Sequence, residues 1–251
     1  MSGETPKSGA RVSRFRPDGR VVMRPQWNDL LFLHWDFSPE HVAPLLPDGL
    51  ELDLFDGRAY VGLVPFEMAN VIPRFVPDLG RLGYFYSRFP ELNVRTYVLR
   101  DGIPGVWFFS LDAASSLATA TARLWFKLPY FKARMRMRRN GNRFDFWSKR
   151  LWPNPTNALC HAKWEIEGEE FGAPPDSLEE FLVERYVLYS RRGGQIFRGR
   201  VYHEPYRLQS ARLQTLRETN LQAAGFSRPH SAPHVLYSRG VDVEVWDLER
   251  C

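Results

Sequence analysis

Alternating hydrophobic and polar positions recur in short runs along most of this chain. Residues 50–54 alternate leucine with acidic residues, which predicts a half-buried strand. An Asp-Gly turn at 56–57 then leads into a second predicted strand over residues 59–64. Similar runs, several of them joined by Asp-Gly or Asn-Gly turns, predict strands at residues 89–99, 105–111, 130–138, 143–148, 160–167, 195–203 and 235–247.

Helical signals are fewer than strand signals. Ser38 followed by Pro39 is typical of a helix start and predicts a short helix ending near Leu46. Small and apolar residues predict a helix over 113–126, with Asp112 as its N-cap and a stop before Pro129. Two further segments are open to two interpretations: a capping-box pattern at 177–180 opens a short helix or strand toward residue 189, and residues 209–224 form an ambiguous helix.

Strands and helices do not alternate regularly along the chain, which disfavours a doubly wound nucleotide-binding fold. The pattern favours a mainly β (α+β) protein, with an antiparallel sheet closed into a β-barrel and two or three flanking helices outside it. Residues 1–24 are basic and polar, and they predict a flexible N-terminal segment. The fold is expected to begin near Gln26, with residues 25–251 forming a single domain.

Composition narrows the function classes. The chain has 251 residues, of which 44% are hydrophobic and 25% charged, so a disordered or collagen-like chain is excluded. No uninterrupted run of about 20 apolar residues and no secretory signal is present, which predicts a cytoplasmic protein without a membrane partner. The two cysteines, and the paired His230 and His234 in a proline-rich stretch, do not fit a zinc site. No nucleotide-binding loop is present, so neither a metal nor a cofactor is expected.

The net charge of +5 comes from one segment. Residues 132–150 carry a charge of +7, whereas the rest of the chain carries −2. Strand periodicity places Lys132, Arg134, Arg136 and Arg138 on one face. This face is either a solvated hairpin or a surface for an anionic partner. Nucleic acid is the less favoured partner, because no recognition motif accompanies the charge.

A second polar row has a different character. Glu91, Asn93, Arg95 and Tyr97 share one face of the strand predicted at 89–99, while the opposite face is apolar. The polar face either contacts solvent or lines an internal site. In such a site, Arg95 would bind a carboxylate and Glu91 would act as a general acid or base.

Several blocks of sequence are familiar in combination, at residues 30–35, 45–50, 55–66, 89–98, 105–112 and 128–131. Together they make the chain resemble the YqjF-like family, a bacterial family of unknown function, over residues 26–248. That family is distantly similar to acetoacetate decarboxylase. The resemblance implies an antiparallel barrel around an internal pocket.

The resemblance also implies a departure in mechanism. In the acetoacetate decarboxylase superfamily, a lysine that follows a proline at a helix exit forms a Schiff base, and a second lysine follows it. Here Pro129 is followed by Tyr130 and Phe131, so both lysines are missing, and the nearest amines are Lys127 and Lys132. The candidate catalytic residues are therefore Glu91, Arg95, Tyr130 and Lys132. The candidate ligand-binding residues are Glu91, Asn93, Arg95, Tyr97, Trp107 and Tyr130, with His34, Tyr60 and Phe109 as further candidates.

Three functional hypotheses follow from these residues. The first is an enzyme, or a former enzyme, with a pocket for a keto acid or another small carboxylate. The second is a non-catalytic binder or sensor that uses the same pocket. The third is a protein that binds an anionic partner through the 132–150 hairpin. The surplus of aromatic residues, with 8 Trp and 18 Phe, is also consistent with a homo-oligomer.

Overall fold

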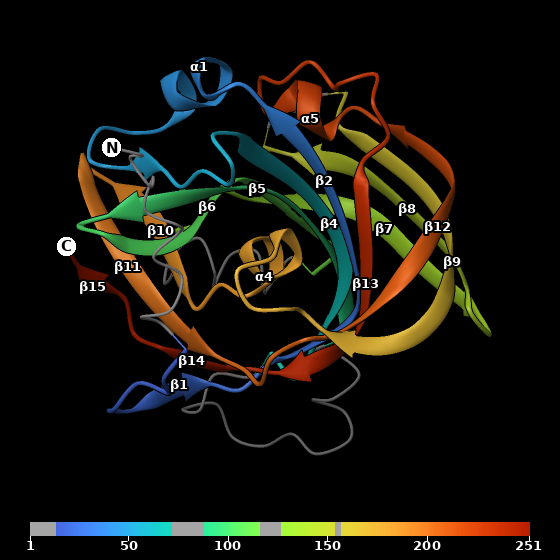
Figure 1. Cartoon of the computed structure of the whole chain (residues 1–251), viewed down its shortest axis with the longest axis horizontal. Coiled ribbons are helices and arrows are strands. Elements are labelled where there is room, and N and C mark those ends of the chain that lie inside the picture. Colours follow the sequence, from blue (N-terminus) through green and yellow to red (C-terminus); the bar gives the residue numbers. More distant parts are fainter. Residues whose placement is uncertain (1–13, 72–87, 116–126, 154–156) are drawn as a thin grey trace, which may run out of the picture.

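The computed structural model describes residues 14–71, 88–115, 127–153 and 157–251. These residues form one large, mostly antiparallel sheet with short helices (Figure 1). The helices are α1 (Pro39–Val42), the 3-10 turn η2 (Ala43–Leu45), α4 (Leu178–Val183) and α5 (Asn220–Ala223). The strands are β1 (Val21–Met23), β2 (Gln26–Phe37), β3 (Glu51–Leu52), β4 (Ala59–Ala69), β5 (Phe89–Arg100), β6 (Ile103–Ala113), β7 (Tyr130–Asn140), β8 (Arg143–Trp152), β9 (Leu159–Gly172), β10 (Val187–Arg192), β11 (Gln195–Tyr202), β12 (Arg207–Glu218), β13 (His234–Asp242), β14 (Glu244–Trp246) and β15 (Glu249–Arg250).

The main sheet closes on itself. Strand pairing runs β2–β4–β5–β6–β7–β8–β9–β12–β13 and returns from β13 to β2. A second group, β10–β11–β14–β1, continues from β6 on the same edge that pairs with β7. The mainly β class and the closed sheet expected from the sequence are therefore confirmed.

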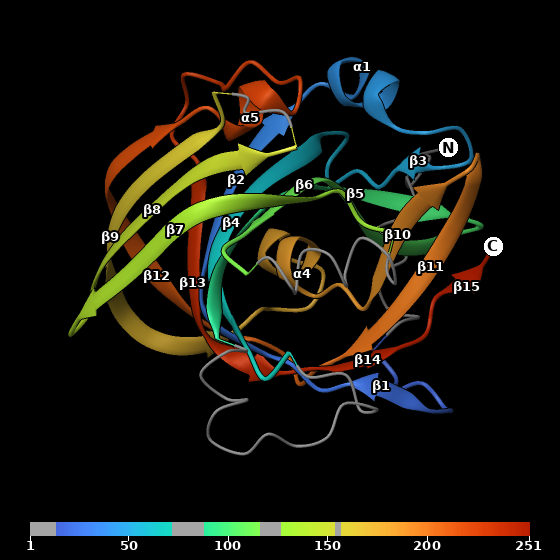
Figure 2. The ribbon, with the colours of Figure 1, turned by 180° about the vertical axis from the view of Figure 1, so that it is seen from behind.

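Strands β2, β4 and β5 have core on both faces. Leu31, Leu33 and Val94 pack inside the closed ring, together with residues of β8 and β9. Leu30 and Phe32, one position away from Leu31 and Leu33 on β2, pack on the opposite face against α4. This second side is enclosed by β10, β11 and β14, and α4 lies within it in both views (Figures 1 and 2). The helices were expected to lie outside the sheet. That holds for α1 and α5 at the rim, whereas α4 is an interior element.

Strand β6 changes partner along its length. Its first half pairs in parallel with β10, at Val106 and Trp107, and its last residues pair in parallel with β7, from Leu111 to Ala113. The remaining pairings are antiparallel. Over residues 108–110, on this edge, β6 pairs with no other described strand. We call this place the β6 fork.

Two predicted helices are corrected. The segment 209–224 forms most of β12, which pairs with β9 and β13, and only its end is helical, as α5. Pairing on both edges outweighs the helix propensity of its Gln, Leu and Arg residues. Asp112, predicted as an N-cap, is a buried residue of β6. The helix predicted over 113–126 falls mostly on 116–126, which lie outside the described residues.

The chain already forms a strand ahead of Gln26. Strand β1 pairs with β14 ahead of Gln26, and Val21 is buried. Arg24 donates to Glu244 at 3.0 Å. The part of the predicted flexible segment from Arg14 to Arg24 is therefore attached to the sheet, while residues 1–13 lie outside the description. None of the described helices has the length and apolar character needed to cross a membrane.

Candidate functional site

The polar row of β5 faces the α4 side of the sheet and is buried. The exposed fractions are 1% for Glu91, 7% for Asn93, 8% for Arg95 and 0% for Tyr97. Strands β4 and β6 flank β5 on both edges. The interpretation of this row as a solvent-facing surface is therefore wrong.

A hydrogen-bond network joins this row to α4 and β2. Tyr97 Oη lies 2.7 Å from His34 Nε2 and donates to the Leu182 carbonyl oxygen of α4 at 2.6 Å. Arg95 Nη2 donates to the same carbonyl at 2.8 Å. One backbone oxygen of α4 thus fixes two side chains of the row.

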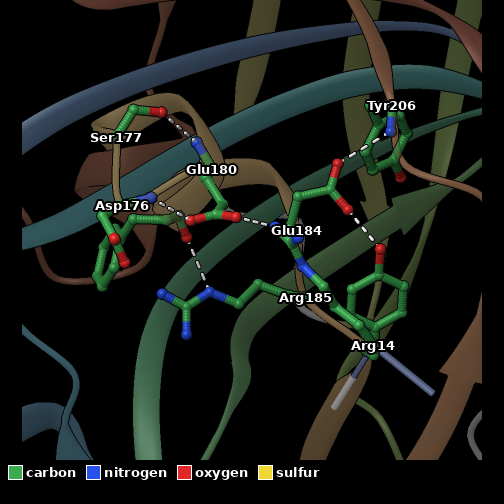
Figure 3. A network of polar contacts seen from close by, with 9 residues as sticks. Arg14, Asp176, Ser177, Glu180, Glu184, Arg185 and Tyr206 are labelled. Atoms are coloured by element: carbon green, nitrogen blue, oxygen red, sulfur yellow. Dashed lines mark hydrogen bonds and ion pairs between the residues drawn. The ribbon is translucent and has the colours of Figure 1, made fainter. Parts of the chain in front are cut away.

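Helix α4 is itself held at both ends (Figure 3). The Ser177 hydroxyl accepts from the Glu180 amide at 3.2 Å, which makes Ser177 a working N-cap, as the capping-box pattern predicts. Glu184 accepts from the Tyr206 amide at 2.9 Å, and Arg185 Nε donates to the Phe181 carbonyl at 2.8 Å. These contacts position the Leu182 carbonyl over the polar row.

Gly62 makes room for this arrangement. It is the cross-strand neighbour of His34 on one side and of Arg95 on the other. A Cβ atom at Gly62 would lie 2.6 Å from His34 Nε2 and 3.5 Å from Arg95 Cγ. The absence of a side chain at this position lets the imidazole and the guanidinium stem approach each other above the sheet.

Arg95 is the buried cation that lacks an anion. Its guanidinium lies 5.5 Å from the Phe32 ring and 5.7 Å from the Tyr97 ring, and none of the described carboxylates forms an ion pair with it. Two other buried arginines differ: Arg150 pairs with Asp112 at 2.8 Å, and Arg185 pairs with Asp53. A buried charge without a counterion is strongly unfavourable, which sets Arg95 apart from Arg150 and Arg185.

Glu91 lies at the other end of the row as a neutral carboxyl group. Burial, with a smaller effect from nearby Asp112, raises the pKa of Glu91 to about 8, although the Tyr130 hydrogen bond acts in the opposite direction. Tyr130 Oη donates to the two Glu91 oxygens at 3.2 and 3.3 Å, and burial beside Glu91 raises the Tyr130 pKa well above its ordinary value. At neutral pH, Glu91 is therefore mostly protonated.

Three buried polar atoms in this region have no hydrogen-bond partner among the described residues. They are Asn93 Oδ1, Arg95 Nε and His34 Nδ1. Burial, followed by the nearby Arg95 charge, lowers the pKa of His34 well below its ordinary value, so this imidazole is neutral. Buried polar groups usually have partners, so these three atoms are exceptions to the rule.

The structure separates the remaining predicted site residues. Trp107 lies on the opposite face of the sheet from Arg95 and packs beside Val98 and Tyr189, so its assignment to this site is wrong. Phe109 packs inside the ring. Lys132 and Tyr60 make other contacts. Lys132 is half-buried, and its amine donates to the Ala114 carbonyl oxygen. The ring of the half-buried Tyr60 lies 6.0 Å from the Phe181 ring of α4.

Sequence reasoning missed the buried ion pairs. Asp112 and Arg150 meet inside the ring, where Asn220 donates to Asp112 at 3.2 Å. Asp53 and Arg185 meet beside α4, and the Arg185 guanidinium lies 4.8 Å from the Tyr97 ring. Each pair joins residues far apart in the chain, and no local pattern identifies such partners. Within the described ranges, no group of three or more His, Cys, Asp or Glu side chains could hold a metal ion.

Comparison with known protein families identifies the chain. Residues 24–242 match the family DUF2071, described as an uncharacterized conserved protein. The chain belongs to this family. Its relatives include the uncharacterized protein YqjF of Bacillus subtilis (strain 168), which is 39% identical over 234 residues, covering 93% of this chain and 94% of that protein. The resemblance to the YqjF-like family is confirmed.

Solved structures show which fold this DUF2071 protein shares. The enduracididine biosynthesis enzyme MppR complexed with pyruvate superimposes with a TM-score of 0.64 at 12% identity, covering 99% of this chain and 98% of that chain. Acetoacetate decarboxylase from Legionella pneumophila superimposes with a TM-score of 0.61 at 12% identity, covering 100% of this chain and 98% of that chain. An acetoacetate decarboxylase-like enzyme from Sphingomonas wittichii RW1 superimposes with a TM-score of 0.61 at 9% identity, covering 93% of this chain and 94% of that chain. At these identities the likeness shows a common fold, which is the acetoacetate decarboxylase-like fold.

Proposed function

We propose that this DUF2071 protein binds a small carboxylate of the keto-acid class at the polar row of β5. The observation that carries the proposal is Arg95, a buried guanidinium without a carboxylate partner in the described chain. A ligand carboxylate on Arg95 would supply the missing negative charge. Planar bidentate pairing is the geometry in which guanidinium and carboxylate groups bind best.

The neighbours of Arg95 suit a keto group beside the carboxylate. Protonated Glu91 is a hydrogen-bond donor, and the unpartnered Asn93 and His34 atoms add polar contacts around the ligand. The fold relative MppR is described in complex with pyruvate, a keto acid, which supports this ligand class.

The chemistry available to the row is proton transfer. A carboxyl group with a pKa near 8 exists in both protonation states close to neutral pH, so Glu91 suits both donation and acceptance of a proton. When ionised, it would take a proton from the carbon beside the keto group. The C–H bond then breaks, an enolate forms, and the enolate later recovers a proton. Imine chemistry through the usual position is disfavoured, because Tyr130 stands directly after Pro129.

Isothermal titration calorimetry with pyruvate tests the binding proposal. We expect the native protein to bind pyruvate more tightly than its uncharged amide, pyruvamide, because the amide offers no charge to Arg95. R95Q should lose at least about tenfold in affinity, since a charge-assisted contact is removed. R217Q, which changes an exposed arginine of β12, is the matched control and should bind normally. Failure of pyruvate, acetoacetate and acetate to bind, or unchanged binding by R95Q, would overturn the proposal.

Proton exchange separates an enzyme from a binder. In D2O, a catalytic row would replace the methyl protons of pyruvate by deuterium, seen as loss of the methyl proton NMR signal. E91Q should abolish this exchange, whereas E51Q, at an exposed position of β3, should not. Pyruvate binding without exchange would assign the protein as a non-catalytic binder or sensor. Borohydride reduction in the presence of acetoacetate, followed by intact mass measurement, tests Lys132 directly, and a stable adduct lost in K132R would reinstate imine chemistry.

A second candidate function uses the outer face of β7. Arg134, Arg136 and Arg138 are exposed, and none forms an ion pair with a described residue. Arg134 also lies directly opposite Lys149 on β8. Like charges at opposed positions are unfavourable in a sheet, which favours an anionic partner that would relieve the repulsion.

Heparin chromatography tests this surface. The triple reversal R134E/R136E/R138E should elute at distinctly lower salt than R207E/R217E/R239E, which makes the same charge change at other exposed positions. Equal elution of the two variants would eliminate the β7 surface as a binding site.

A further inference from the structure

The β6 fork opens onto a groove of about 620 Å³. One wall comes from the segment that leads into β7, and the other comes from the end of β10 and its turn into β11. Phe108 lies at its base, where β6 lacks a neighbour on this edge among the described strands. The groove is lined by Leu45, Trp107, Phe108, Phe109, Lys127, Leu128, Pro129, Tyr189, Ser190, Arg191, Arg192, Gly193 and Gly194.

The charged residues described in the lining of this groove are all basic. Lys127, Arg191 and Arg192 line it, and no acidic residue does among those that the structure describes. None of the three forms an ion pair with a residue in the described ranges. The Lys127 amine lies 3.1 Å from the centre of the Phe197 ring of β11, which places this cation across the groove from its own segment. Three cations that line one concave surface produce a positive field there.

A buried hydroxyl also points to a ligand. Ser190 lines the groove and is 1% exposed, yet its Oγ has no hydrogen-bond partner among the described residues. Because buried hydroxyl groups are normally paired, this atom indicates a missing polar contact.

Flat apolar surface lies beside these charges. Trp107 and Phe109 contribute aromatic rings, and Leu45, which is 40% exposed, forms part of the rim. Gly193 and Gly194 have positive φ angles of 58° and 78°, and no atom lies within 4 Å of the position a Cβ would take at either residue. The turn therefore leaves the mouth of the groove open.

We propose that the β6 fork binds a small organic phosphate that carries a flat aromatic or heteroaromatic ring. Phosphate is favoured over a monocarboxylate because it brings about two negative charges to three cations, and arginine pairs with phosphate through two parallel hydrogen bonds. The ring would pack against Trp107, and Ser190 Oγ would donate to a phosphate oxygen. The volume is within the range of about 300–1,000 Å³ seen for small-molecule sites. The site is separate from the polar row of β5, since neither Glu91 nor Arg95 lines the groove.

Calorimetric titration with AMP and with phenyl phosphate tests this proposal, because both probes combine a ring with a phosphate. We expect binding in the micromolar to millimolar range that weakens as salt rises. Adenosine, which has no phosphate, and inorganic phosphate, which has no ring, should each bind at least about tenfold more weakly. If neither probe binds, or if inorganic phosphate binds as tightly as AMP, the proposal is wrong.

Two variants locate the site. R191S/R192S should weaken AMP binding at least about tenfold, while R207S/R217S removes the same charge from exposed positions of β12 and should not. Both doublets are exposed, so the fold should survive in each. S190A should weaken AMP binding more than adenosine binding, because the hydroxyl contacts the phosphate. AMP binding that is indifferent to R191S/R192S would place the ligand elsewhere and overturn the inference.

Discussion

At the scale of single residues, the contrast between paired and unpaired buried charges governs what substitutions do. Asp53 and Arg185 neutralise each other, whereas Arg95 has only carbonyl, hydroxyl and ring contacts. We expect D53N to lower the free energy of unfolding by about 3–5 kcal/mol, because it leaves a buried arginine without its anion. R95M should lower it much less, since it leaves no charge behind. Urea denaturation of both variants measures the difference, and a larger loss in R95M would contradict this account.

Glu91 makes stability depend on pH with a definite sign. Its pKa in the folded protein, about 8, lies above the ordinary value of 4.5, so the folded state holds its proton longer than the unfolded chain does. The contribution of Glu91 to stability is therefore fully present below about pH 4.5 and decreases as pH rises toward 8. Between pH 6 and pH 8, the free energy of unfolding of E91Q should rise relative to that of the native protein by up to about 1.4 kcal/mol per pH unit. A difference between the two proteins that does not change with pH would show that Glu91 titrates normally.

Gly62 tests how tightly His34 and Arg95 are packed. G62A should lower the free energy of unfolding by about 1–3 kcal/mol, because the new methyl group would overlap His34 Nε2. The control is G172A in β9, where no atom lies within 4 Å of the added Cβ and the backbone is not in the left-handed region. Thermal unfolding of the two variants provides the comparison, and equal losses would refute the packing argument.

Residue patterns predicted part of this site. Period-two alternation placed Glu91, Asn93, Arg95 and Tyr97 on one face, because side chains alternate on any strand. The pattern did not reveal that this face is buried, since burial depends on α4, almost 90 positions further along the chain. Trp107 was grouped with this row from its residue type alone, whereas it pairs with Thr96 and so lies on the face opposite Arg95.

At the scale of elements, local signals worked where turns and caps decide the structure. The strands on either side of the turns at 101–102 and 140–141 form as predicted, because Asp101, Gly102 and Gly141 suit the positive φ angles found there. β12 was mistaken for an ambiguous helix, since its pairing with β9 and β13 comes from distant segments.

The two predicted N-caps differ, and this difference is measurable. Ser177 accepts a hydrogen bond from the Glu180 amide, whereas Ser38 makes no side-chain bond to its helix backbone and contacts His41 instead. S177A should therefore lower the free energy of unfolding by about 1 kcal/mol, and S38A by only a few tenths. Chemical denaturation distinguishes them, and a larger effect at Ser38 would mean that the cap of α4 is dispensable.

At the scale of the whole molecule, the closed sheet divides the interior into two compartments that share strands. Leu31 and Leu33 belong to one compartment, and Leu30 and Phe32 belong to the other. Sequence alone predicted one barrel with one interior, because alternation cannot show that both faces of a strand are covered by different parts of the chain. The proposed carboxylate site and the ring interior are therefore on opposite sides of β5.

The change of partner along β6 has a consequence for how this chain assembles. Leu111 pairs with Tyr130, which follows it closely in the sequence. Val106 pairs with Leu188, which comes far later in the sequence. Loop closure over such a span is entropically slow, so the fork should be among the last parts to form, after the local hairpins. During synthesis, before Leu188 has left the ribosome, one edge of the first half of β6 would have no partner strand. That unpaired edge would be the part of the nascent chain most prone to aggregation.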